Sequence, residues 1–192
     1  MCKAKIGNKV IDATSPTYII AEMSANHGGD FNKALEIVSV AAESGADAIK
    51  LQTYRADTIT LDSDKEDFFI PSDNPWESHK TLFSLYEKAY TPWEWHHDLI
   101  QEGKKLGLDV FSSAFDSSAV EFLEKLDVPA YKIASPEITD VGLLKKVAQT
   151  KKPVIVSTGV AGLSDIVLAV GTLRKEGCEQ IILLKCTSSY PA

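Results

Sequence analysis

Short apolar runs alternate with amphipathic stretches along almost the whole chain. The apolar runs have the length of buried strands, and they predict strands over residues 18–24, 48–54, 109–114, 130–135, 153–159 and 180–188. The amphipathic stretches predict helices over residues 30–44, 80–89, 92–106, 117–126, 141–149 and 164–176. Several of these helices have a capping residue at the predicted start, namely Asp30, Asp116 or Ser117, Asp140, and Thr91 followed by Pro92. The pattern is typical of an α/β protein.

A repeated strand–helix unit predicts parallel strands with right-handed crossovers, as in an open doubly wound sheet or a (β/α)8 TIM barrel. Polar residues within otherwise apolar strands separate the two architectures; these are Glu22, Lys50, Gln52, Lys132 and Ser157. Helices cover both faces of an open sheet, whereas a barrel can turn such residues inward near its C-terminal mouth. No GxGxxG motif follows the first strand. The sequence therefore favours the barrel.

The barrel predicted from this sequence is incomplete. About six strand–helix units are present rather than eight, and the chain ends in the loop after the sixth strand. We therefore expect a TIM barrel truncated after these units, in a fragment of a longer protein. Residues 55–91 form an acidic connection that is too long for an ordinary loop, and long connections of this kind often carry function.

Composition excludes several classes of protein. A formal net charge of −7 argues against a nucleic-acid partner and against a polybasic membrane anchor. No apolar run is long enough to span a bilayer, and the N-terminus lacks the apolar core of a signal peptide. The 3 cysteines, which show no zinc-type spacing with histidines, indicate a reducing cytoplasm without a disulfide framework.

Two lysines within strands give the sharpest chemical signal. Lys50 and Lys132 lie in "AIKLQTY" and "AYKIAS", and lysines are rarely buried without a partner. They could extend from the strand ends to solvent, or they could bind one anionic ligand such as a phosphate or a carboxylate. Hydroxyl residues at the ends of strands could cap helices or complete an oxyanion site with the lysines; these are Ser112, Ser113, Ser135, Ser157 and Thr158.

Glu22 is the candidate general acid or base. It could instead form a structural ion pair with Lys50 on the neighbouring strand, and both roles are compatible because a nearby cation keeps the carboxylate ionised. Asn26 and Gln52 could bind hydroxyl or amide groups of a substrate, or serve the structure only. His27 could likewise contact a substrate or serve the structure only. The other three histidines are interpreted as structural, namely His79, His96 and His97.

The motifs resemble those of the sialic acid synthase family. The matching segments are "YIIAEMSANHGGD", "SGADAIKLQTY", "FSSAFD", "AYKIASPEI", "PVIVSTG" and "LLKCTSSYPA", in that order from about residue 18 to residue 192. Two further stretches, "KLQTYRADTITLD" and "AYTPWEWH", are most similar to the pseudaminic acid synthase branch. Members of the family condense phosphoenolpyruvate with an acetamido sugar, and they join a (β/α)8 barrel to a C-terminal antifreeze-like domain.

The resemblance implies roles for individual residues. Glu22 matches the catalytic glutamate, and Lys50 and Lys132 match the lysines that hold phosphoenolpyruvate. Further matches to substrate-binding positions are Ser135, Ser157, Ser188 and Tyr190. The N-acetylneuraminate branch tends to carry Asn at the position of Ser188, which puts the sugar contact there in doubt.

The resemblance also implies a divalent metal, Mn²⁺ or Mg²⁺, held by two histidines that lie beyond Ala192, and a homodimer of the full-length protein. No metal ligand is therefore expected within residues 1–192, which form the N-terminal part of the synthase barrel. We expect the isolated fragment to be inactive and poorly stable because its barrel edge is open.

The implied enzyme is a transferase that forms a C–C bond between phosphoenolpyruvate and 2,4-diacetamido-2,4,6-trideoxy-altrose, giving pseudaminate and phosphate. Other acetamido sugars, as in N-acetylneuraminate or legionaminate synthases, remain alternatives. So do a 3-deoxy-sugar acid synthase and a catalytically dead fragment that binds a sugar or a partner protein.

Overall fold

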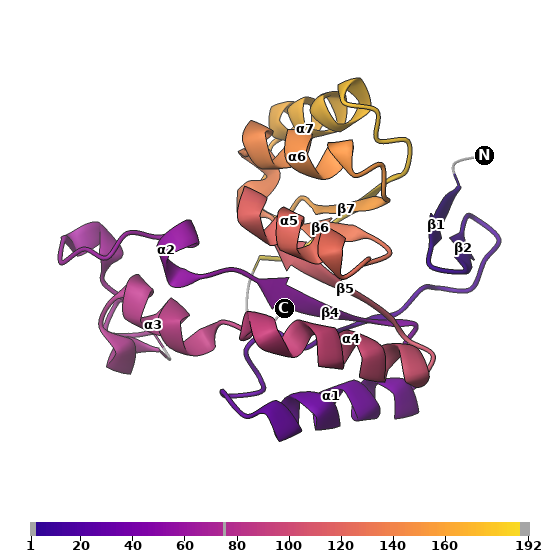
Figure 1. Ribbon diagram of the computed structural model, residues 1–192. Helices are drawn as coiled ribbons and strands as arrows, with labels where there is room; N and C mark the ends of the chain where they lie inside the picture. Colours follow the sequence, from indigo (N-terminus) through magenta and orange to yellow (C-terminus); the bar gives the residue numbers. More distant parts are fainter. Residues whose placement is uncertain (1–2, 75, 189–192) are drawn as a thin grey trace.

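The computed structural model, which describes residues 3–74 and 76–188, is built around a curled parallel sheet (Figure 1). The 6 strands lie in the order β3-β4-β5-β6-β7-β8, so each strand pairs with the next one along the chain. Their bounds are Ile20–Glu22 (β3), Ala48–Thr53 (β4), Asp109–Ala114 (β5), Tyr131–Ile133 (β6), Val154–Ser157 (β7) and Ile181–Leu184 (β8). This sheet, alternating with helices, is part of a TIM barrel, which confirms the predicted fold.

The helices between the strands pack along the outer side of the sheet. They are Phe31–Glu43 (α1), His96–Lys105 (α4), Ser117–Lys125 (α5), Val141–Gln149 (α6) and Leu163–Lys175 (α7). The predicted caps Asp30, Asp116 and Asp140 each accept a hydrogen bond from a backbone N–H in the first turn of the helix that follows. None of the described helices combines the length and apolar character needed to cross a membrane.

One predicted cap was wrong. A 3₁₀ turn, Trp93–Trp95 (η3), follows Pro92, and α4 begins only at His96. The Thr91 hydroxyl does not cap a helix but lies 3.2 Å from Nε2 of His27. The sequence pattern was misleading here because a proline is as compatible with the start of a 3₁₀ turn as with the start of an α-helix.

A β-hairpin near the N-terminus was not predicted. Its strands, Ala4–Ile6 (β1) and Lys9–Ile11 (β2), pair antiparallel around Gly7, which has φ of 54°. Each strand has 3 residues, too few to show an alternating pattern. The backbone N–H of Lys5 donates to Oε1 of Gln180, just before β8, so the hairpin lies at the amino end of the sheet.

The long connection between β4 and α4 contains more structure than the sequence predicted. The expected helix is present as Leu82–Ala89 (α3), and it is preceded by Ala56–Ile59 (α2), Glu66–Phe68 (η1) and Glu77–His79 (η2). We call residues 55–91 the insertion. Figure 1 shows it extending from the carboxyl end of β4, away from the other helices. Because TIM-barrel sites lie at the carboxyl ends of the strands, this position allows the insertion to form one wall of a site.

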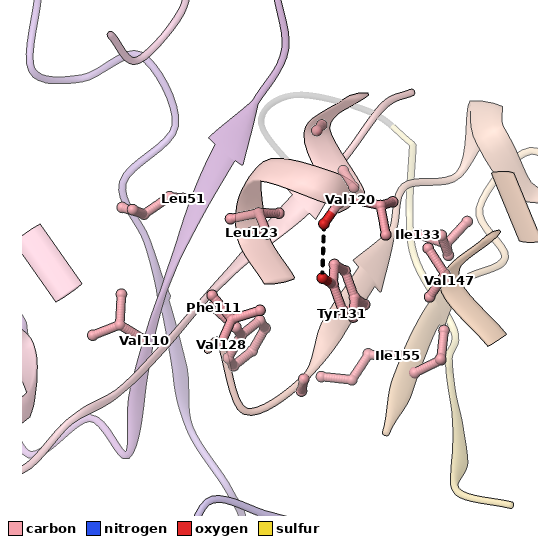
Figure 2. Packing of buried hydrophobic residues seen from close by; sticks show 14 of the residues in the cluster. Leu51, Val110, Phe111, Val120, Leu123, Val128, Tyr131, Ile133, Val147 and Ile155 are labelled. Carbon is pink, nitrogen blue, oxygen red and sulfur yellow. Dashed lines mark hydrogen bonds between the residues drawn. The ribbon is translucent and has the colours of Figure 1, made fainter. Parts of the chain in front are cut away.

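Outward-facing strand residues form the core with the helices. Figure 2 shows Tyr131 of β6 among Val120 and Leu123 of α5, with Val147 of α6 nearby. The Tyr131 hydroxyl lies 3.2 Å from the Val120 carbonyl oxygen and 2.9 Å from Oε1 of Glu124, so it is satisfied although the ring is fully buried. This packing uses the outer face of the sheet and leaves the inner face for other side chains.

Candidate active site

The strand register brings the predicted charged residues to one face of the sheet. Glu22 is paired with Lys50 across β3 and β4, and Ser113 is paired with both Gln52 and Lys132 across β4, β5 and β6. Paired residues in neighbouring parallel strands point to the same face, and alternate residues along a strand share that face. All five side chains therefore lie on the inner face near the carboxyl ends of their strands, as the sequence predicted for the four other than Ser113.

Glu22 and Lys50 form an ion pair. Nζ of Lys50 lies 2.7 Å from Oε2 of Glu22 and donates a second hydrogen bond, 3.1 Å long, to the Ser113 hydroxyl. Lys50 is only 5% exposed, whereas 52% of the Glu22 side chain is exposed. The lysine is thus held rigidly by two partners while the carboxylate keeps an open side. The structural pairing expected as one alternative is present, and it leaves Glu22 accessible to a ligand.

Lys132 adds a second buried cation. It is 7% exposed, and its Nζ donates to the carbonyl oxygen of Ile133 at 3.0 Å. Burial and, after it, the positive charge of Lys50 lower the pKa of Lys132 to about 8, against the opposing effect of Glu22. The two ammonium groups therefore lie near one half-exposed carboxylate, Glu22, and one buried carboxyl group, Glu137, whose own burial raises its pKa and favours its neutral form. A ligand with negative charge would relieve this imbalance, because buried charges are costly unless they are paired.

Hydroxyl groups from the next strands meet around Gly159. Its backbone N–H donates to the Ser135 hydroxyl at 3.1 Å, and a methyl group at Gly159 would overlap the hydroxyl of Ser188. The loops after β6, β7 and β8 therefore come together at this glycine. Ser157 ends β7 and is buried. Three of the predicted serines thus lie at the same ends of adjacent strands, while Tyr190 lies outside the described residues.

Ser112 needs a correction. The sequence analysis grouped it with the substrate-binding residues, but its side chain lies on the outer face of β5, beneath the helices. Its hydroxyl is 2.7 Å from the Thr53 hydroxyl, which in turn is 2.8 Å from Nε2 of His96. The inner-face position belongs to the next residue, Ser113. Strand periodicity would have separated the two serines, since Ser113 shares a face with Lys132 and Ser112 does not.

The buried cluster of Ser112, Thr53 and His96 is neutral and fully connected. Nδ1 of His96 donates to the Pro92 carbonyl oxygen at 3.2 Å, so Nε2 accepts from Thr53, and Thr53 accepts from Ser112. Burial lowers the pKa of His96 to about 4. The prediction that His96 is structural agrees with these contacts.

Glu137 is a site residue that the sequence analysis missed. It lies in Pro136–Thr139 (η4), directly after β6, and its Oε2 is buried without a hydrogen-bond partner among the described residues. Burial raises its pKa, while the charge of Lys132 lowers it. The charge of Glu137 also raises the pKa of Tyr86 in α3, though less than the burial of Tyr86 does. Its position five residues after Lys132, at the end of a strand, was the available signal.

His27 is neutral and structural. Its Nδ1 accepts a hydrogen bond of 3.0 Å from the Gly29 backbone, so Nε2 carries the proton that is donated to the Thr91 hydroxyl. Burial lowers the pKa of this imidazole. The hydrogen bond between His27 and Thr91 joins the loop after β3 to the last residue of the insertion. The Trp95 ring packs edge-on against the imidazole, with 5.5 Å between the ring centroids.

A pocket of about 640 Å³ opens between the loop after β3, the end of β4 and the insertion. Asn26 and Gln52, both predicted to bind substrate, line it together with Ser24. Asn26 donates its side-chain amide to the Met23 carbonyl oxygen at 2.9 Å, which leaves its amide oxygen for a ligand. No group of three or more His, Cys, Asp or Glu residues that could hold a metal ion is found in residues 3–74 and 76–188.

Comparison with known proteins gives consistent matches over the chain. It is 48% identical over 177 residues to a pseudaminic acid synthase of Helicobacter pylori, with 92% of this chain and 52% of that protein covered. A pseudaminic acid synthase of Campylobacter jejuni is 44% identical, with 97% and 53% covered. An N,N'-diacetyllegionaminic acid synthase of Legionella pneumophila is 35% identical, with 97% and 53% covered. The chain therefore spans about half the length of the curated relatives it matches.

Solved structures agree with these matches. An N-acetylneuraminic acid synthetase from Leptospira borgpetersenii, solved in complex with citrate, superposes with a TM-score of 0.83 at 33% identity, covering 99% of this chain and 61% of that chain. The spore coat polysaccharide biosynthesis protein SpsE from Bacillus subtilis gives a TM-score of 0.81 at 34% identity, covering 100% and 49%. The family model described as the NeuB family matches residues 37–192. The chain belongs to the NeuB family.

Proposed function

We propose that this chain forms the phosphoenolpyruvate-binding part of a pseudaminic acid synthase. The reaction condenses phosphoenolpyruvate with 2,4-diacetamido-2,4,6-trideoxy-altrose and water to give pseudaminate and phosphate. One observation carries the proposal: Lys50 and Lys132 are buried on the same face beside the half-exposed carboxylate of Glu22. The 48% and 44% identity to two pseudaminic acid synthases supports this choice of sugar.

The two lysines suit the charge of the donor substrate. Phosphoenolpyruvate carries a phosphate and a carboxylate on the same carbon, C2, and each can accept charge-assisted hydrogen bonds from an ammonium group. Ser135, Ser157 and the Gly159 loop add hydroxyl groups at the ends of the next strands. In this proposal these residues fix the enol ester in place, so their contribution is orientation and electrostatic stabilisation.

The proposed chemistry forms one C–C bond between the substrates and one C–O bond between C2 and water, and it breaks the C2–O bond to phosphate. C3 of phosphoenolpyruvate attacks the aldehyde carbon of the open-chain sugar, which takes up a proton on its oxygen. Water adds to C2, and the tetrahedral intermediate then releases phosphate with cleavage of the C2–O bond. Glu22 moves a proton, either from the attacking water or to the sugar oxygen, because its open side faces the ligand while Lys50 holds the other side.

The divalent metal and the homodimer belong to the same proposal and concern the full-length protein. The described residues do not supply a metal site, so no step above is assigned to a metal ion. A second candidate is the same condensation with the acceptor of a legionaminate synthase, which the 35% identity to the Legionella protein supports.

The proposal is tested with the full-length protein that contains this sequence. It is incubated with phosphoenolpyruvate and, separately, with 2,4-diacetamido-2,4,6-trideoxy-altrose, with the acceptor of the legionaminate enzyme, and with N-acetylmannosamine. Phosphate release and product mass are measured. We expect the fastest release with the altrose derivative. Release of phosphate with none of the acceptors would contradict the proposed activity, and faster release with another acceptor would assign a different sugar.

A further inference from the structure

The pocket between the loop after β3 and the insertion has two chemically different ends. The residues next to the charged cluster are polar: Gln52 follows Lys50 by two positions on the same face of β4, and Ser24 and Asn26 lie in the loop that follows Glu22. The residues contributed by the insertion are mainly apolar, and they include Ile70, Trp76, Leu82 and Leu85. A ligand that fills the pocket is therefore contacted by polar groups at one end and by hydrocarbon at the other.

The position of the pocket fixes how an acceptor sugar would lie in it. The reacting aldehyde must meet phosphoenolpyruvate, which is bound at Lys50 and Lys132, so C1 points toward the polar end. The far end of an open-chain hexose, C6, then reaches the wall formed by the insertion. Tyr86 of α3 also lines the pocket, and its ring packs against that of Tyr54, which directly follows β4.

We propose that the apolar wall of the insertion, centred on Leu82 and Leu85 of α3, selects acceptor sugars that carry a methyl group at C6 in place of a hydroxymethyl group. This inference rests on the proposed function and adds to it a location for the specificity. Against such a wall, a hydroxymethyl group must give up its hydrogen bonds to water without receiving new ones.

The size of the effect follows from the contacts of a single group. One methylene or hydroxyl difference in an apolar pocket changes kcat/KM by about 10–200-fold. The Tyr54 and Tyr86 rings, which pack edge to face at 5.7 Å, hold the base of α3 against the barrel, so the wall has a fixed position. We therefore expect the protein to prefer the 6-deoxy member of a matched pair of acceptors by about tenfold or more.

The test uses the full-length protein and two acceptors that differ at one position, N-acetylmannosamine and its 6-deoxy analogue. The ratio of the two kcat/KM values is measured by phosphate release. The variant Leu85→Asn should reduce the ratio to near one. Leu85→Ala keeps a good helix former and should reduce it in the same direction but less. The matched control is Leu61→Asn, since Leu61 is in the insertion, is 66% exposed and does not line the pocket.

A binding measurement separates failure of this inference from failure of the proposed function. Saturation-transfer NMR on the same pair of sugars needs no turnover, and the C6 methyl protons of the deoxy sugar should receive the strongest transfer, weakened by Leu85→Asn. Strong methyl transfer without phosphate release would support the wall and overturn the activity. Phosphate release with equal kcat/KM for the two sugars, or a ratio that Leu85→Asn and Leu85→Ala leave unchanged, would overturn the wall.

Discussion

The inner and outer faces of the same strands carry buried polar groups in different electrical states. On the inner face, two buried cations, Lys50 and Lys132, lie near one half-exposed carboxylate and one buried carboxyl group whose raised pKa favours its neutral form. On the outer face, Ser112, Thr53 and His96 form a neutral chain in which every donor has an acceptor. A satisfied neutral cluster stabilises the fold, whereas an excess of buried positive charge is relieved only when an anion binds. Charge imbalance, rather than buried polarity alone, distinguishes the site.

The largest expected effect comes from removing the half-exposed carboxylate of the inner face. In the full-length protein, Glu22→Gln keeps the shape of the side chain but cannot take up a proton, so kcat should fall about 10²–10⁴-fold, roughly 3–5 kcal/mol. Steady-state kinetics measure this change. Glu36→Gln on the exposed side of α1 is the matched control and should leave kcat unchanged. Near-normal turnover of Glu22→Gln would remove this residue from the chemistry.

The outer face should show a large dependence of stability on pH. The pKa of His96 is about 4 in the folded protein and about 6.5 in the unfolded chain, so the neutral form stabilises the fold. This contribution is complete above pH 6.5 and is lost as the pH falls to 4, which corresponds to about 3 kcal/mol. Urea unfolding of the wild type and of His96→Gln between pH 7.5 and 4 should give a flatter profile for the variant. The neighbouring exposed residue provides the control His97→Gln, which should keep the wild-type slope.

Lys132 tests the inner face by affinity. Lys132→Met removes one cation and should raise the KM for phosphoenolpyruvate about 10–100-fold, since a hydrogen bond to a charged group contributes about 1.5–3 kcal/mol. Because the pKa of Lys132 is about 8, the wild-type affinity should also weaken as the pH rises above 8, and the variant should lack this step. Steady-state kinetics measure the KM, and calorimetric titration at pH 7, 8 and 9 measures how the affinity changes with pH. An unchanged affinity in Lys132→Met would show that the lysine does not bind the anion.

The smallest effects should come from the adjacent residues Ser112 and Ser113. They compare the two faces directly, because one serine lies on each face. Ser112→Ala removes a donor from the outer cluster and should cost about 1 kcal/mol of unfolding free energy with no change in the KM for phosphoenolpyruvate. Ser113→Ala removes a partner of Lys50 and should change that KM by severalfold with little loss of stability. Denaturant unfolding and kinetics on both variants complete the comparison. The reverse pattern would mean that the faces had been assigned incorrectly.

Much of the fold could be predicted because the spacing of apolar residues along a short segment distinguishes helices from strands. The barrel followed from Lys50, Gln52 and Lys132, since only an inner face accommodates such residues on parallel strands. The hairpin around Gly7 could not be found in this way, because its strands are too short to repeat. The role of Thr91 depended on His27, which is far away in the sequence, so no local pattern could reveal it.

The sequence predicted those site residues that place a charge in an apolar strand. It was less informative about residues whose role depends on the face of the sheet to which the side chain points. Glu22 and Lys50 stood out because charged residues in apolar strands are rare. Ser112 and Ser113 differ only in the face to which they point, and composition does not distinguish them. Glu137 was missed because its burial depends on how η4 packs against α6 and α7, which is a tertiary contact.

The hydrogen bond between His27 and Thr91 has a mechanical consequence. It holds the last residue of the insertion to the loop after β3, while the start of the insertion is held in place because the backbone continues into it from β4. The loop after β3 and the insertion are thereby held together at the carboxyl ends of the strands. Widening the pocket between them requires either breaking this hydrogen bond or moving both segments together, so entry of the proposed acceptor sugar is coupled to an imidazole that does not line the pocket.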